Sequence, residues 1–254
     1  MIYGHIAFAA AAALATTVLG HMEMTKPCSR YTPHGNGCSL LPDGQSYDYS
    51  LSSPLASSAP LCKHTIPYNK PSETWTAGKD ITVSFYPNSG VGHRGGHCQW
   101  SVSYDSGKTF AVVHEVLRYC FYNGPSTSNT PEVRSYTFAL PENLPSSDKV
   151  VFAWTWVNAA GNREFYMNCA DVAIKGSSSS HYTGKEMVIA NHDGYPTIPE
   201  FGDNYDTGIK YYEDAKNITV SASGGSGGSA ETGNSESASS DSSVNSASNS
   251  ASVS

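Results

Sequence analysis

The chain has 254 residues, of which 39% are hydrophobic and 15% are charged, and its formal net charge is −7 at pH 7. This acidic balance argues against a nucleic-acid partner, because binding to phosphates needs a basic surface. A chain of this length and apolar content can form one domain with a sizeable core.

The first twenty residues have the pattern of a secretory signal peptide. Residues 6–19 form an apolar, alanine-rich stretch, and Val18 and Gly20 suit the positions before a cleavage site. The stretch is too short for a comfortable transmembrane span, and no later segment qualifies as one. We therefore expect cleavage after Gly20 and a secreted, extracellular, monomeric protein that begins with His21 and does not contact a membrane.

Six cysteines fit an oxidising compartment such as the extracellular space. The chain contains no C-x-x-C pair, which argues against a zinc cluster. We expect three disulfides, which are Cys28–Cys38, Cys62–Cys169 and Cys98–Cys120. The first of these pairs would close a short loop that contains glycine and proline.

The middle of the chain has strong strand signals and weak helix signals. Residues 81–86 and 99–104 alternate apolar and polar side chains, and a turn at residues 105–108 connects the second run to a further strand at 109–116. Other strands are expected at residues 135–138, 150–156 and 165–174. Short strands separated by turn residues predict an all-β fold, an antiparallel sandwich of immunoglobulin or fibronectin-like type.

Long loops and a low-complexity tail accompany these strands. Residues 22–69 and 176–212 are rich in Gly, Pro, Tyr and Ser, and long loops on a rigid sandwich often carry function. Residues 221–254 consist mainly of Ser, Gly, Ala and Asn, which cannot bury enough apolar surface to offset the entropy of ordering. We expect one domain at 21–220, then a flexible tail, with an N-glycosylation acceptor at Asn217.

The sharpest candidate for chemistry is the expected new N-terminus, His21. Its free α-amine and its imidazole could together bind one metal ion, and a set of three nitrogens suits copper. The third nitrogen would come from His93, in a glycine-rich segment just before a strand. His97 competes for this place, and we expect it to have a structural role. The alternative is that a histidine at the mature N-terminus is chance and that His93 is an exposed loop residue.

A carboxylate and a phenol form the third part of the predicted site. On a strand, Glu164 and Tyr166 point to one face, whereas Phe165 and Met167 point to the other. Tyr166 could lie in the axial direction of the ion, and Glu164 could hydrogen-bond an oxygen species or pass it a proton. The alternative is that Tyr166 is a core aromatic and Glu164 a surface charge.

Together these motifs resemble the lytic polysaccharide monooxygenases of auxiliary activity family eleven, or a close fungal branch of it. The matching segments are residues 21–24, 60–63, 93–99, 103–110, 152–156 and 161–169. The resemblance implies a β-sandwich with a flat copper face, copper bound to His21 and His93, an axial Tyr166 and an active-site Glu164. It also implies oxidative cleavage of β-1,4 bonds in chitin, with an external electron donor and with hydrogen peroxide or dioxygen as co-substrate.

Other functions stay open from the sequence alone. A non-catalytic copper-binding or cell-wall protein could use the same ligands, although storage needs no proton donor and Glu164 therefore favours the enzyme. A chitin-binding adhesive protein is a weaker alternative. A glycosidase would need a second carboxylate across the bond, and the sequence offers no convincing partner for Glu164. Several tyrosines could stack on sugar rings or simply pack, namely Tyr182, Tyr195, Tyr205, Tyr211 and Tyr212.

Overall fold

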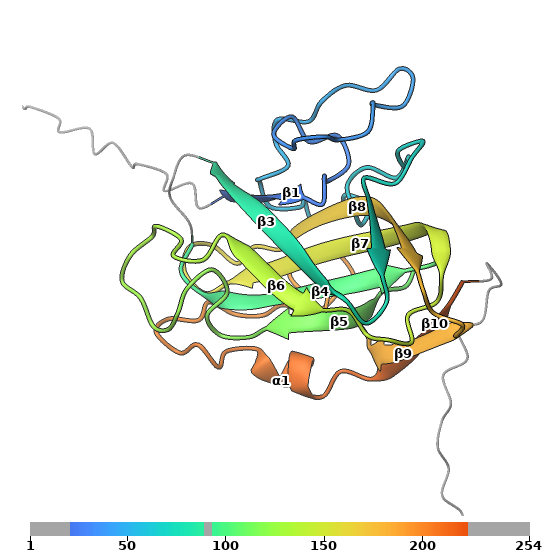
Figure 1. The fold of residues 1–254 in the computed structure, drawn as a ribbon. Helices are drawn as coiled ribbons and strands as arrows, with labels where there is room; N and C mark the ends of the chain where they lie inside the picture. The colour runs from blue at the N-terminus through green and yellow to red at the C-terminus, as the bar shows by residue number, and fades with distance from the viewer. Residues whose placement is uncertain (1–20, 89–92, 223–254) are drawn as a thin grey trace, which may run out of the picture.

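The computed structural model of the protein describes residues 21–88 and 93–222, which form a β-sandwich with long covering loops (Figure 1). The expected signal peptide and its cleavage site lie outside the described residues. So does the expected tail, except for its first two residues. Within the described part of the chain, no helix has the length and apolar character needed to cross a membrane.

The smaller layer of the sandwich is a three-stranded antiparallel sheet with the order β1-β3-β6. Its strands are β1 (His21–Lys26), β3 (Asp80–Asn88) and β6 (Ser135–Ala139). His21 pairs with Asn88, so the first residue of β1 lies beside the last residue of β3. Alternation along β1 buries Met22 and Met24 completely in the core between the layers.

The larger layer is a five-stranded sheet with the order β2-β8-β7-β4-β5. Its strands are β2 (Glu73–Thr76), β4 (Gly96–Ser103), β5 (Ala111–Val116), β7 (Ser147–Asn158) and β8 (Tyr166–Lys175). All neighbours are antiparallel except β2 and β8. Near the end of β7, Trp156 pairs with Tyr166, the first residue of β8. These strand ends lie near the start of β1, because the His21 ring lies 6.3 Å from that of Tyr166.

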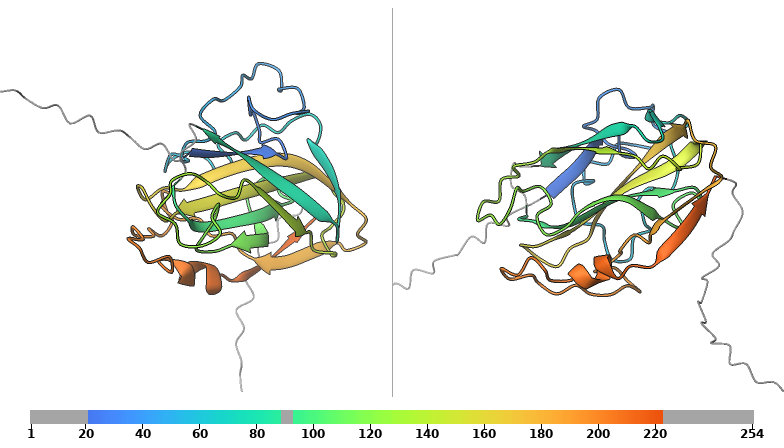
Figure 2. Two further views of the ribbon diagram at one scale, coloured as in Figure 1. Left: turned by 60° about the vertical axis from the view of Figure 1, so that its left-hand side comes forward. Right: turned by 60° about the horizontal axis from the view of Figure 1, so that its bottom comes forward.

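Short elements complete the fold on the side opposite the N-terminal loops (Figures 1 and 2). They are β9 (His181–Lys185), β10 (Asn217–Ser221) and α1 (Ile209–Glu213), and β9 pairs with β10. The predicted antiparallel sandwich is confirmed. The expectation of loops over 22–69 and 176–212 was wrong at β1, β9 and α1, because tertiary burial of residues such as Met22 and Tyr212 stabilises these short elements.

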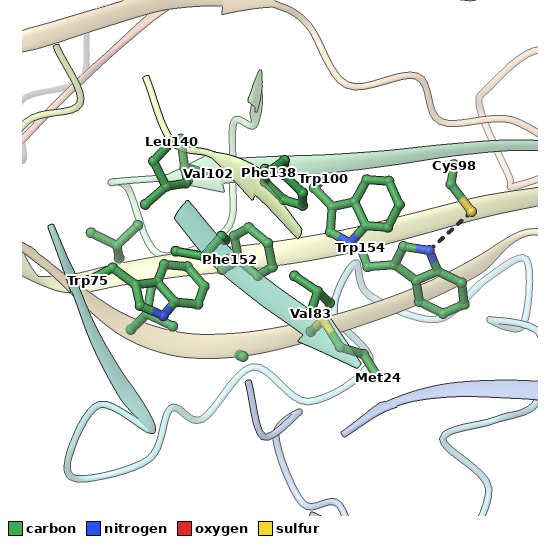
Figure 3. Close-up of a cluster of buried hydrophobic side chains, with 14 of the residues drawn as sticks. Met24, Trp75, Val83, Cys98, Trp100, Val102, Phe138, Leu140, Phe152 and Trp154 are labelled. Carbon is green, nitrogen blue, oxygen red and sulfur yellow. Dashed lines mark hydrogen bonds between the residues drawn. The ribbon is translucent and has the colours of Figure 1, made fainter. Parts of the chain in front are cut away.

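The core between the layers is dominated by aromatic side chains (Figure 3). Trp100, Trp154 and Trp156 are fully buried, and the Trp154 indole donates a hydrogen bond to the Cys98 sulfur at 3.2 Å. Phe85 of the smaller sheet packs edge-on against Trp154 at 4.8 Å between ring centroids. The aromatic core reaches the edge of the sandwich at Trp156, whose ring lies 4.8 Å from that of Tyr166.

Two disulfides and a buried ion pair fix loops to this framework, and a third disulfide closes the N-terminal loop on itself. The disulfides are Cys28–Cys38, Cys62–Cys169 and Cys98–Cys120, the pairs named above from the sequence. Cys62–Cys169 attaches the N-terminal loops to β8, and the buried Arg30 guanidinium does the same through Asp171 at 2.6 Å. The loops beside β1 are therefore anchored to the strand that begins with Tyr166.

Candidate metal centre

Three candidate ligands meet at the edge of the sandwich where β1 and β8 begin. His21 is the first residue of β1, Tyr166 is the first residue of β8, and His93 lies in the segment that leads into β4. The ring centroid of Tyr166 lies 6.3 Å from that of His21 and 6.3 Å from that of His93. The phenol therefore lies equally near both imidazoles, although the three residues are far apart in the sequence.

Glu164 connects this group through hydrogen bonds. Its Oε2 accepts one from the Tyr166 hydroxyl at 2.7 Å and lies 3.0 Å from Nε2 of His93. The Glu164 side chain is only 17% exposed, so this carboxylate is held in place rather than free in solvent. Glu164 precedes β8 instead of lying on it, yet its side chain and that of Tyr166 still face the same site.

The electrostatics of the group favour an ionised Glu164 carboxylate beside a neutral His21 imidazole and a protonated Tyr166 phenol. Burial lowers the pKa of the His21 imidazole. The charge of Glu164 raises this pKa and that of His93 lowers it, and the resulting pKa lies below its usual value. Burial raises the pKa of the Glu164 carboxyl, but hydrogen bonds from His93 and Tyr166 outweigh it, so that this pKa lies below its usual value. Burial and the Glu164 charge raise the pKa of Tyr166 well above its usual value. The His21 imidazole is therefore available as a neutral donor to a cation.

Gly161 supports the imidazole of His93 from behind. A Cβ at this position would lie 2.3 Å from Nδ1 and 2.4 Å from Cε1 of His93, and its φ is +109°. The Asn158 side-chain amide shapes the turn by donating to the carbonyl oxygens of Ala160 at 2.8 Å and Asn162 at 3.0 Å. Sequence reasoning missed this contact, although a glycine shortly before Glu164 was the available signal.

His97 lies outside the group and has no free ring nitrogen. Its Nδ1 accepts a hydrogen bond from the Arg118 backbone N–H, and its Nε2 donates to the Thr207 carbonyl oxygen, both at 3.0 Å. Burial lowers its pKa to about 4. The structure therefore gives His97 a structural role between the larger sheet and the segment that precedes α1.

A fully buried carboxylate lies two residues after His21 on β1 and was not anticipated from the sequence. Glu23 is fully buried and hydrogen-bonds the Thr32 hydroxyl and, at 2.8 Å, Nδ1 of His34. The His34 ring stacks on Tyr86 with 4.6 Å between centroids. The alternation of His21 and Glu23 along β1 was the only sequence signal, because the partners come from the loop closed by Cys28–Cys38.

The donor set of this group fits copper on the condition that the chain is processed so that His21 has a free α-amine. Among residues 21–88 and 93–222, no cluster of three His, Cys, Asp or Glu side chains could hold a metal ion by itself. Two imidazoles joined by the α-amine of a processed His21 would supply three nitrogens, which is a set that copper prefers. Nε2 of His93 is hydrogen-bonded to Glu164, so a metal bound at that nitrogen would replace this hydrogen bond.

Comparison with known proteins gives the chain its family. No family model matches it. The AA11 family lytic polysaccharide monooxygenase A of Aspergillus fumigatus is 36% identical over 189 residues, which cover 70% of this chain and 77% of the relative. An AA11 family lytic polysaccharide monooxygenase of Aspergillus oryzae is 33% identical over 190 residues, which cover 68% of this chain but only 40% of that longer relative.

Two solved structures are similar to the chain at low sequence identity. A chitin binding domain from Burkholderia pseudomallei is 16% identical with a TM-score of 0.37, over 61% of this chain and 99% of that one. A cellulose-active polysaccharide monooxygenase from M. thermophila is 15% identical with a TM-score of 0.41, over 63% of this chain and 78% of that one. Such scores carry no argument about substrate. The identity and coverage of the A. fumigatus relative show that the chain belongs to the AA11 family of lytic polysaccharide monooxygenases, which are copper-dependent oxidoreductases.

Proposed function

We propose that the protein is secreted and cleaves the β-1,4 bonds of chitin oxidatively, with His21 and His93 as copper ligands. The observation that supports the site is that the Tyr166 ring lies equally near both imidazoles, and that Glu164 Oε2 lies within hydrogen-bonding distance of both Tyr166 and His93. The choice of chitin rests on the family resemblance of the motifs described above. Three disulfides support secretion, because such bonds persist in oxidising compartments.

Each residue of the group has a distinct part in this proposal. The amine and imidazole of His21 and the imidazole of His93 hold the copper ion. The ion would supply one-electron chemistry with peroxide or dioxygen once an external donor has reduced it. The Tyr166 ring lies 6.3 Å from each imidazole between centroids and is only 1% exposed, so it excludes water from the space that it fills beside them. Its phenol stays protonated and donates to Glu164.

Glu164 is the group that can hold a proton beside the two histidines. Its Oε2 accepts a hydrogen bond from the Tyr166 hydroxyl and lies within hydrogen-bonding distance of Nε2 of His93. The carboxylate can therefore hold or release a proton at Oε2, beside His93, where the copper ion would be bound. A protein that only stores copper has no need of this carboxylate, which favours the enzyme over the non-catalytic alternative.

The test is mass spectrometry of the soluble products. Protein that begins with His21 is loaded with copper and incubated with chitin and ascorbate, beside a control without ascorbate and a His93→Ala variant. Oxidised chito-oligosaccharides should form only with the reductant and only with His93 present. Oxidised products from cellulose but not chitin would refute the substrate. No oxidised product from any glycan, despite bound copper, would instead support the copper-binding alternative.

A further inference from the structure

A hollow of about 220 Å³ opens beside His93. Its wall is formed by Arg94, residues 159–161 just after β7, residues 200–203 and Tyr205. Arg94 directly follows His93, and Gly161 lies against the His93 imidazole, so the hollow and the candidate metal centre share a wall. Pockets for whole small ligands measure roughly 300–1,000 Å³. This smaller hollow therefore suits one substituent of a larger ligand.

The cationic residue of the wall, Arg94, makes only part of its possible hydrogen bonds with the described residues. Nε of Arg94 is buried and has no hydrogen-bond partner within the described ranges 21–88 and 93–222. One terminal nitrogen of the same guanidinium donates to the Ser126 carbonyl oxygen at a long 3.3 Å. A buried donor without an acceptor is costly, and an acceptor on a ligand would remove this cost.

The rest of the wall adds acceptors and an apolar floor. Glu200 and Asp203 are exposed carboxylates at the rim, and Glu200 is only loosely paired with Arg163 at 3.9 Å. Phe201 is 5% exposed and Ala159 is buried, so both offer apolar surface. The hollow thus combines a cationic donor, anionic acceptors and an apolar surface within one small volume.

We propose that this hollow receives the 2-acetamido group of a sugar ring in a chain bound across the candidate metal centre; the inference rests on the proposed function. An acetamido group has a carbonyl oxygen, an N–H and a methyl group. Arg94 donates to the carbonyl oxygen, a rim carboxylate accepts from the N–H, and the methyl group packs on Phe201. Glucose carries a hydroxyl at this carbon, which leaves the apolar surface and part of the polar set unmatched.

The consequence is that Arg94 and its neighbours select chitin over cellulose. A site built around hydrogen bonds to one substituent rejects an analogue that lacks it, because its polar groups are then left unpaired. The copper-binding residues play no part in this choice. Substrate preference and copper affinity should therefore respond to different substitutions.

Isothermal titration calorimetry of the copper-loaded full-length chain from His21 onward, without reductant, tests the inference. The probes are the hexamer of N-acetylglucosamine and cellohexaose, both neutral, so the net charge of the protein does not bias the comparison. Arg94→Gln removes the guanidinium, and Ala160→Leu fills the hollow while Arg94 stays. Lys149→Gln is the matched control, because this exposed residue lies near the opposite end of β7.

The wild type should bind the N-acetylglucosamine hexamer about tenfold more tightly than cellohexaose, a factor typical of one added hydrogen bond to a charged group. Arg94→Gln and Ala160→Leu should lose this preference with unchanged copper affinity, and Lys149→Gln should keep it. No preference in the wild type, or an intact preference in both hollow variants, would overturn the inference. If oxidised products still form from chitin in that case, the proposed function stands; if the wild type forms none, the function fails and the inference with it.

Discussion

Gly161→Ala is the most informative substitution behind the candidate metal centre. The added Cβ would lie 2.3 Å from Nδ1 of His93, about 1 Å closer than the ordinary contact of 3.4 Å. The clash is with a ring held between Glu164 and the Gly161 turn, so the imidazole must shift by about that distance. We expect a loss of copper affinity of roughly 10- to 100-fold, the usual cost of changing a residue that orients a metal ligand.

The control for this substitution is Gly194→Ala. Gly194 also has a left-handed backbone, with φ of +84°, but nothing lies within 4 Å of a Cβ built there. Both variants should lose about 1–2 kcal/mol of unfolding free energy from backbone strain. Copper affinity is measured by competition with a chromophoric chelator, and unfolding by thermal melts. Equal copper affinity in the two variants would refute the role assigned to the Gly161 contact.

Three further predictions concern the neighbouring residues. His93→Ala should weaken copper binding strongly. His97→Ala should keep copper binding but lose about 2 kcal/mol of unfolding free energy, because two hydrogen bonds are removed. If copper titrations and thermal melts gave the reverse result, the roles of the two histidines would be exchanged. Glu164→Gln should keep copper but slow product formation, because an amide cannot accept a proton; unchanged rates in a product assay would remove Glu164 from the chemistry. Burial lowers the pKa of His97 to about 4 in the folded state, against 6.5 in the unfolded state. Between these values only the unfolded state binds the proton, so the unfolding free energy should fall by on the order of 3 kcal/mol as the pH is lowered from 6.5 to 4. Melts over this range should show a smaller fall for His97→Gln, and an equal fall would contradict the assignment.

The strands of the sandwich were predictable because their sequences carry local signals. Alternation marked residues 81–86, which lie in β3, and residues 99–104, all but the last of which lie in β4. The predicted turn at 105–108 does lie between β4 and β5. The elements β1, β9 and α1 lack such signals, since each is short and lies in a segment rich in loop-forming residues. Their formation depends on tertiary contacts that no local pattern encodes.

The candidate site was also predictable only in part: its main residues were identified from the sequence, but their surroundings were not. His21, His93, Glu164 and Tyr166 are chemically distinctive side chains. The expected strand spacing grouped Glu164 with Tyr166, and the two do interact, although Glu164 precedes β8 instead of lying on it. The environment of the site was not predictable, because it comes from residues distant in the sequence. Gly161 acts through a backbone turn, Glu23 through a loop about ten residues away, and the wall beside Arg94 through residues 200–203 and Tyr205.

The central claim is that copper is bound by an N-terminal His21 together with His93. The most direct test compares Cu(II) binding by protein that begins with His21 and by protein that begins with Gly20. The first should bind one ion and give an electron paramagnetic resonance spectrum of all-nitrogen equatorial ligation. The added glycine turns the amine into an amide, so affinity should fall by more than the roughly 10- to 100-fold cost of changing a residue behind a ligand. Equal affinity and identical spectra for the two forms would contradict the claim.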